Sequence, residues 1–95
     1  MLYTFSQAHY SGAELQRYLT DITENDAVVL WQDGVLLAAK YGKMFTQCKG
    51  QCFVLEQDVL ARNLTALLPE NNQVWSISLT DLVDLTAQYL PQIAL

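Results

Sequence analysis

The chain has 95 residues, of which 52% are hydrophobic and 16% are charged, and its formal net charge is -5. This length suits one compact domain over residues 1–95. The five Lys and Arg residues are spread out, which disfavours direct binding of nucleic acid, since affinity for a phosphate backbone needs clustered cations. The longest apolar runs, Ala27–Trp31 and Val35–Ala39, are far too short to cross a membrane.

The scarcity of charge also predicts an oligomer. A small domain leaves much of its surface exposed, and surplus apolar residues are tolerated there when another subunit covers them. The N-terminus lacks the pattern of a secretory signal, so we expect a cytoplasmic protein. In that compartment Cys48 and Cys52 would be thiols rather than a structural disulfide.

The first half of the chain predicts strands and helices in alternation. Leu2–Phe5 is a short β-prone run, and Ser11 with Glu14 forms a capping box that predicts a helix start near Ser11. Apolar residues then follow at helical spacing on one face: Leu15, Tyr18, Leu19 and Ile22. Ala27–Trp31 has the continuous apolar pattern of a strand buried on both faces, which is typical of parallel sheets.

The middle of the chain continues the alternation. Val35–Tyr41 predicts a short helix, followed by a less regular stretch that ends at Gly50. Gln51–Leu55 predicts a strand and Gln57–Leu64 a helix. Asn63 can close that helix, because asparagine tolerates a left-handed backbone conformation better than most residues.

The last third predicts a loop, a strand and a long helix. The loop is marked by Pro69, Asn71 and Asn72. Val74–Ser78 predicts a strand, Leu79–Leu90 a helix, and Gln92–Leu95 a weakly signalled strand. The apolar face of this helix is wider than one sheet contact needs, so we expect its surplus to form an interface; it comprises Leu79, Leu82, Val83, Thr86 and Leu90, extended by Leu85 and Tyr89.

This order of elements predicts an α/β fold: a single small domain with an open, mainly parallel sheet of four to five strands and helices on both faces. The carboxyl ends of parallel strands share one edge, where ligands and partners bind in such folds. Asp33, Asp58, Ser78 and Thr80 follow the strands, and one hypothesis is that they line a crevice at this edge. Capping of the helices that follow them is the simpler expectation, because it explains each residue without a ligand.

The residues give little support for catalysis. Cys48 and Cys52 are spaced C-x3-C; we expect Cys52 to be a buried, inert thiol in its strand and Cys48 to be a bystander near the surface. His9 is the single histidine, which disfavours a metal site or a catalytic triad. With no Gly-rich phosphate loop either, we predict no cofactor and a binding subunit rather than an enzyme.

Four segments together resemble the TusB/DsrH family, the smallest members of the DsrE/DsrF/DsrH group of sulfur-relay proteins. They are Met1–Thr4, Leu30–Val35, Val54–Arg62 and Leu79–Thr86. The match covers nearly the whole chain, in order and with similar spacing. The family's Arg-Gly pair appears here as Arg62-Asn63, a departure that affects only the local helix cap.

The resemblance implies a heterohexamer with two copies each of three related subunits, in which TusC-like and TusD-like chains are the partners. It further implies that this chain is a non-catalytic subunit supporting 2-thiolation of the wobble uridine of tRNA. The TusD-like subunit carries the sulfur-accepting cysteine near the end of its third strand, whereas Leu55–Asp58 here contains none. With the motifs included, the candidate crevice or partner-binding residues are Asp33, Gly34, Glu56, Asp58, Arg62, Thr80 and Asp81.

Other hypotheses remain open at the level of sequence. Cys48 or Cys52 could carry persulfide, or Asp33, Asp58 and Thr80 could bind a small regulatory ligand. A DsrH-like subunit could instead serve dissimilatory sulfur oxidation, because the same architecture is used for both pathways. Without its partners, the isolated chain could form a homo-oligomer.

Overall fold

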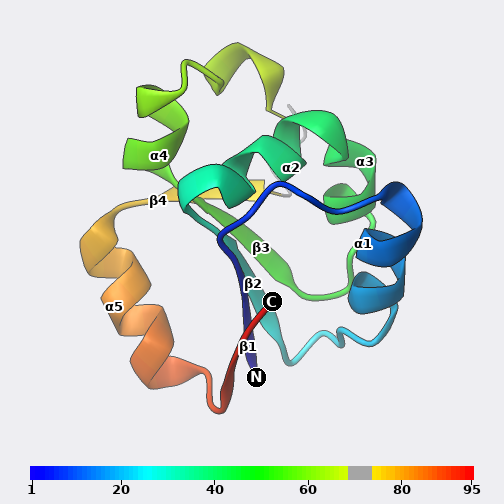
Figure 1. The fold of residues 1–95 in the computed structure, drawn as a ribbon. Coiled ribbons are helices and arrows are strands. Elements are labelled where there is room, and N and C mark those ends of the chain that lie inside the picture. Colours follow the sequence, from blue (N-terminus) through cyan, green and yellow to red (C-terminus); the bar gives the residue numbers. More distant parts are fainter. Residues whose placement is uncertain (69–73) are drawn as a thin grey trace.

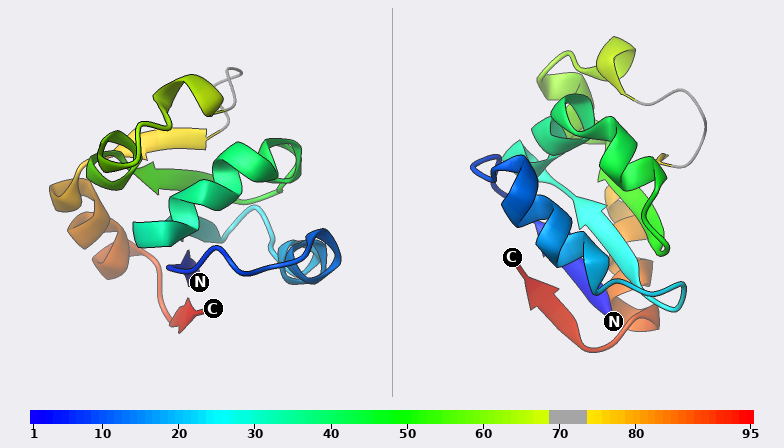
Figure 2. Two further views of the ribbon diagram at one scale, coloured as in Figure 1. Left: turned by 45° about the horizontal axis from the view of Figure 1, so that its top comes forward. Right: turned by 90° about the vertical axis from the view of Figure 1, so that its right-hand side faces the viewer.

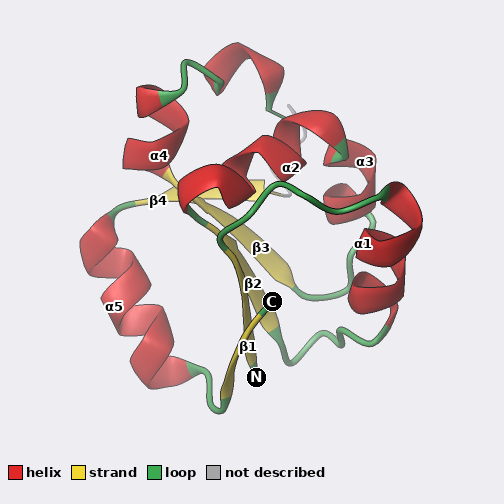
Figure 3. Cartoon of the chain, in the orientation of Figure 1, coloured by secondary structure: helices red, strands yellow, loops and turns green. Residues whose placement is uncertain are grey.

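The computed structural model describes residues 1–68 and 74–95, and a five-stranded sheet runs through them (Figure 1, Figure 3). The strands are β1 (Leu2–Phe5), β2 (Ala27–Leu30), β3 (Gln51–Leu55), β4 (Val74–Ile77) and β5 (Gln92–Ala94). Their order is β4-β3-β2-β1-β5, and every neighbouring pair is parallel. The predicted α/β class and parallel sheet are confirmed, including the weakly signalled C-terminal strand.

Helices cover both faces of this sheet, as predicted. They are α1 (Gly12–Thr20), α2 (Val35–Lys40), α3 (Gly42–Thr46), α4 (Glu56–Ala61) and α5 (Leu79–Gln88), with short 3-10 turns η1 (Gln32–Gly34) and η2 (Thr65–Leu67). The expectation of an irregular stretch before Gly50 was wrong in part, because α3 forms there directly after α2. The predicted loop at Pro69, Asn71 and Asn72 lies outside the described residues.

Helix α4 is shorter than predicted. It ends at Ala61 instead of Leu64, and Asn63 has a φ of 54°, so this residue does adopt the expected left-handed conformation. The Leu64 amide then donates to the Val59 carbonyl at 3.1 Å, and the Leu64 side chain packs into the core.

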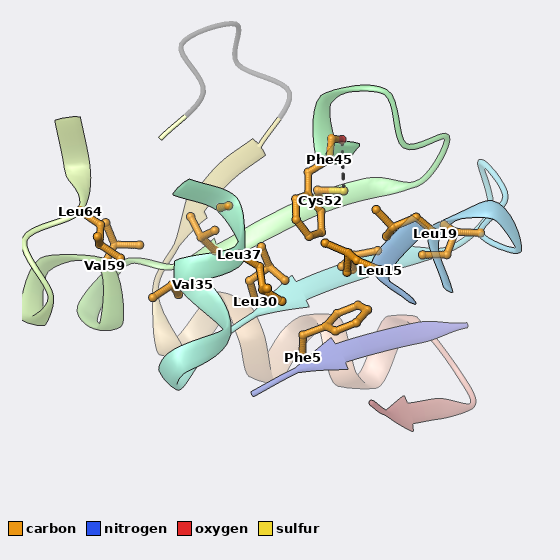
Figure 4. Packing of buried hydrophobic residues seen from close by; sticks show 14 residues of the cluster. Phe5, Leu15, Leu19, Leu30, Val35, Leu37, Phe45, Cys52, Val59 and Leu64 are labelled. Carbon is orange, nitrogen blue, oxygen red and sulfur yellow. Dashed lines mark hydrogen bonds between the residues drawn. The ribbon is translucent and has the colours of Figure 1, made fainter. Parts of the chain in front are cut away.

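The face of the sheet that carries α1, α2 and α3 holds the main core (Figure 4). Side chains alternate along β2, so Val28 and Leu30 point to this face and Ala27 and Val29 to the other. The buried side chains of the main core include Phe5, Leu15, Leu19, Ile22, Val35, Leu37, Phe45, Cys52, Val54 and Val59. We call this side of the sheet the α1 face.

Among the described helices, α5 alone covers the opposite face, and Figure 2 shows it on the other side of the strands from α1. Its buried cluster holds three small or aliphatic side chains, those of Leu2, Ala27 and Val29. Partly buried side chains pack against them, among them Leu82, Leu85 and Tyr89 of α5. We call this side the α5 face. Among the described helices, none is long and apolar enough to span a lipid bilayer.

Candidate functional site

The turn after β2 and the helix after β3 meet at the carboxyl edge of the sheet. The backbone of Gln32 has a φ of 53°, a conformation that is costly for a residue with a side chain. Its amide donates to Oδ2 of Asp58 at 2.6 Å, and this charge-assisted hydrogen bond holds the turn in place. Asp58 therefore does not cap a helix, as one sequence alternative proposed, but fixes the backbone of η1.

Arg62 ties the same two segments together. Its guanidinium donates to Oδ1 of Asp33 from Nη2 at 2.8 Å and from Nε at 3.2 Å. It also donates to the Asp58 carbonyl oxygen from Nη1 at 3.2 Å, and that nitrogen lies 3.7 Å from Oδ1 of Asp58. Three of the predicted crevice residues thus meet in one charge cluster. Each charge already has a partner within the cluster. The cluster therefore fits a structural role, joining the two segments, better than a ligand site.

Gly34 allows two backbone segments at this edge of the sheet to approach closely. A Cβ atom at this position would lie 1.9 Å from the carbonyl oxygen of Phe5, which leaves no room for any larger residue. The glycine therefore lets η1 run directly against the end of β1. This close approach brings Asp33 into reach of Arg62.

The remaining rim candidates lie apart from that cluster. Asp81 belongs to a capping box at the start of α5: its amide donates to Oγ of Ser78 at 3.1 Å, and the Ser78 amide donates to its carboxylate at 3.2 Å. Thr80 is exposed in the same turn, and Glu56 is exposed at the start of α4. No hydrogen bond or ion pair within residues 1–68 and 74–95 joins these three to Arg62.

The α5 face carries an apolar surface that the chain leaves open. Trp75 is 55% exposed, Leu79 53% and Val83 60%. Trp75 pairs in register with Phe53, which packs on the α5 face, so alternation places the indole on that side of the sheet. We call Trp75, Leu79 and Val83 the open apolar surface.

The predicted apolar face of α5 is only partly covered in the structure. Leu82, Leu85 and Tyr89 pack on the sheet, whereas Leu79, Val83 and Leu90 are exposed. The expected surplus therefore exists, and it lies on the side of the helix that turns away from the strands. Trp75 was not among the residues predicted for the interface. A signal for it is its place beside Val74 in the same short strand, because Val74 packs on the main core and its neighbour must point to the opposite face.

On the α1 face, described residues line two hollows. One, of about 420 Å³, is largely apolar and runs between α2 and η2, where Leu36, Lys40 and Leu67 line it. The other, of about 200 Å³, lies between α1 and α3; it is lined by Gln16, Leu19, Thr20, Ile22, Met44, Gln47, Cys48 and Lys49. Cys48 therefore borders a pocket with several polar side chains.

The two thiols differ sharply in environment. Cys52 is fully buried in β3, as predicted, whereas Cys48 is half-buried. The hydrogen bond from the Cys52 thiol lowers the pKa of Cys48 to about 7, and a hydrogen bond from the Gly50 backbone acts in the same direction against partial burial. Donating that hydrogen bond raises the pKa of Cys52, and burial raises it further. In neutral solution Cys48 is the more nucleophilic of the two.

Comparisons with known proteins agree with this fold. The family described as "DsrH like protein" matches residues 8–92. An uncharacterized protein of Haemophilus influenzae is 60% identical over the full length of both chains, and "Protein TusB" of Yersinia pestis and of Yersinia pseudotuberculosis is 38% identical over 99% of each chain. The solution NMR structure of protein Tm0979 from Thermotoga maritima has a TM-score of 0.61 at 18% identity over 93% of both chains, a likeness in fold.

Proposed function

Since this chain belongs to the DsrH-like protein family, we propose that it is a TusB-like, non-catalytic subunit of a sulfur-relay complex. In this proposal it joins TusC-like and TusD-like subunits in a heterohexamer that supports 2-thiolation of the wobble uridine of tRNA. The observation that carries the proposal is the open apolar surface, because an exposed tryptophan with two exposed aliphatic side chains is typical of a surface that another protein covers.

The charged and apolar residues of this surface indicate what kind of partner surface would fit it. Residues 63–95 contain no Lys or Arg, and α5 carries exposed Asp81 and Asp84 beside Leu79 and Val83. A partner that fits would bring an apolar centre surrounded by basic side chains. We assign this role to a related subunit of the same complex, since the TusB resemblance gives this chain such partners.

The charge of the chain fits a subunit that does not hold tRNA itself. Its net charge is -5, and one of its five cations, Arg62, is engaged by Asp33 and Asp58. Affinity for a phosphate backbone depends on free, clustered Lys and Arg. In the proposed complex, the tRNA and the transferred sulfur would therefore be bound by other subunits.

The missing thiol at the end of β3 supports a non-catalytic role. The comparable position of a TusD-like subunit carries the sulfur acceptor, whereas Leu55–Asp58 here supplies two carboxylates. A carboxylate cannot accept persulfide sulfur. Negative charge would also raise the pKa of any thiol brought close to it and so weaken it as a nucleophile.

Quantifying tRNA 2-thiouridine in a bacterial strain that lacks this chain tests the proposal. We expect the modification to be lost on deletion, and to return both with the wild-type chain and with the Cys48→Ser/Cys52→Ser double variant. Normal 2-thiouridine in the deletion strain would contradict a role in tRNA thiolation and turn attention to dissimilatory sulfur oxidation. Failure of a stably folded double variant to restore it would instead favour the persulfide-carrier alternative.

A further inference from the structure

A short turn between α3 and β3 leads from Cys48 to the strand that contains Cys52. Gly50 sits at the bottom of this turn, where a Cβ atom would lie 2.7 Å from Cγ2 of Ile22 and 2.8 Å from the carbonyl oxygen of Asp26. The turn is thus pressed against the segment that leads from α1 to β2. This packing fixes the position of Cys48 relative to the strand that begins directly after the turn.

The Cys52 thiol is anchored inside the main core. Its Sγ lies 3.6 Å from the carbonyl oxygen of Phe45, the contact drawn in Figure 4, and 3.8 Å from that of Gly50. The backbone amide of Cys48 donates to that same Phe45 carbonyl oxygen at 3.3 Å, so both cysteines meet at one oxygen atom. The pKa shifts of the two thiols, each caused first by the other, agree with this closeness. Cys48 in turn packs against the core from one side and lines the pocket of about 200 Å³ from the other. One thiol is therefore accessible and the other is hidden behind it.

We propose that Cys48 and Cys52 form a reactive dithiol site, in which Cys48 attacks a small hydrophilic disulfide that enters the pocket and Cys52 resolves the resulting mixed disulfide. This inference does not depend on the proposed function. Gln16, Thr20, Gln47 and Lys49 line the pocket, and these polar and cationic groups fit the amide and carboxylate groups of a small peptide disulfide.

The exchange balances without any further reagent. The Cys48 thiolate forms a bond to one sulfur of the disulfide R–S–S–R, and the first R–S⁻ leaves. Cys52 then loses its proton and attacks the Cys48 sulfur, and the second thiolate leaves and takes up that proton. In total, the dithiol is oxidised to a Cys48–Cys52 disulfide, and one molecule of R–S–S–R is reduced to two of R–SH.

A resolving thiol at Cys52 would also affect any persulfide formed on Cys48. A carrier must keep its persulfide intact until the acceptor arrives, whereas a second thiol in contact with it can attack the inner sulfur. That attack would form the Cys48–Cys52 disulfide and release hydrosulfide, so sulfur bound to Cys48 would be lost. The resolving position of Cys52 therefore makes Cys48 suitable for disulfide exchange and unsuitable as a lasting sulfur carrier.

Incubation of the reduced, native chain with oxidised glutathione, followed by intact-mass measurement and peptide mapping, tests the site. We expect the wild type to lose two hydrogens and to yield a linked Cys48–Cys52 peptide pair. Cys52→Ala should stop at a glutathione adduct on Cys48, and Cys48→Ser should lose the reaction. Alkylation of Cys48 should accelerate as the pH rises through about 7, where the thiol becomes the more reactive thiolate.

Measurements on the wild type keep the proposal falsifiable even if replacing buried Cys52 disturbs folding. A stable glutathione adduct on the wild-type chain, with no linked peptide pair, would overturn the resolving role of Cys52. The absence of any reaction unless denaturant is added would overturn the accessibility of Cys48. An adduct that forms first on Cys52 would reverse the assigned order of attack.

Discussion

Helices α1 and α5 begin in the same way and end up in different surroundings. Each starts with a serine capping box, formed by Ser11 with Glu14 and by Ser78 with Asp81, and they contain nine and ten residues. Yet α1 buries Leu15 and Leu19 in the main core, whereas α5 buries no residue fully. Local sequence therefore determines that both helices form, and the neighbours of each helix determine how much of it is covered.

The neighbours of the two helices differ in number. On the α1 face, α2 and α3 pack beside α1, and together they enclose Phe5, Phe45 and Leu37 (Figure 4). Within residues 1–68 and 74–95, α5 is the only helix on the α5 face, and part of its apolar surface stays exposed. We interpret the α5 face as the half of the protein that a related subunit completes, because the free energy of apolar burial is gained only when that surface leaves water.

The largest difference should appear when one core residue and one open-surface residue are truncated. Leu15→Ala should lower the free energy of unfolding by about 2–5 kcal/mol, since it removes a buried side chain and leaves a cavity in a filled core. Val83→Ala should change it by less than about 0.5 kcal/mol, because the side chain is 60% exposed. Urea denaturation of the isolated chain measures both, and equal losses would refute the contrast between the faces.

A smaller effect tests whether α5 is formed before any partner binds. Ser11→Ala and Ser78→Ala each remove the side chain that accepts the hydrogen bond of a helix amide, at 3.2 Å and 3.1 Å. We expect each to cost about 1 kcal/mol of stability in the isolated chain. If only Ser11→Ala had an effect in urea denaturation, α5 would have to form on assembly, and its exposed side chains would not be a preformed surface.

Much of the fold could be predicted, because its signals are local. The capping box at Ser11, the apolar run of β2 and the left-handed Asn63 each depend on neighbours within a few residues. Helix α3 was missed because glycine disfavours a helix, whereas here Gly42 starts a new helix against α1. The sequence also did not decide which side of α5 meets the sheet, since its apolar face is wider than one sheet contact needs.

The candidate site depended more on tertiary structure. Arg62 meets Asp33 across 29 positions of the chain, and a helix-capping role for Asp33 was the simpler expectation. The topology of the parallel sheet decides between these alternatives, because it brings the turns after β2 and β3 to one edge. The closeness of Cys48 to Cys52 likewise depends on the turn at Gly50, which the C-x3-C spacing alone does not specify.

The most direct test of the central claim is native mass spectrometry of this chain co-expressed with the proposed TusC-like and TusD-like partners. Val83→Asp adds a charge to the open apolar surface, and Ala13→Asp adds the same charge to the exposed first turn of α1, where helices tolerate acidic residues. We predict a mixed complex for the wild type and Ala13→Asp, and an unassembled chain for Val83→Asp. A mixed complex that forms equally well with Val83→Asp would contradict the α5 face as the interface.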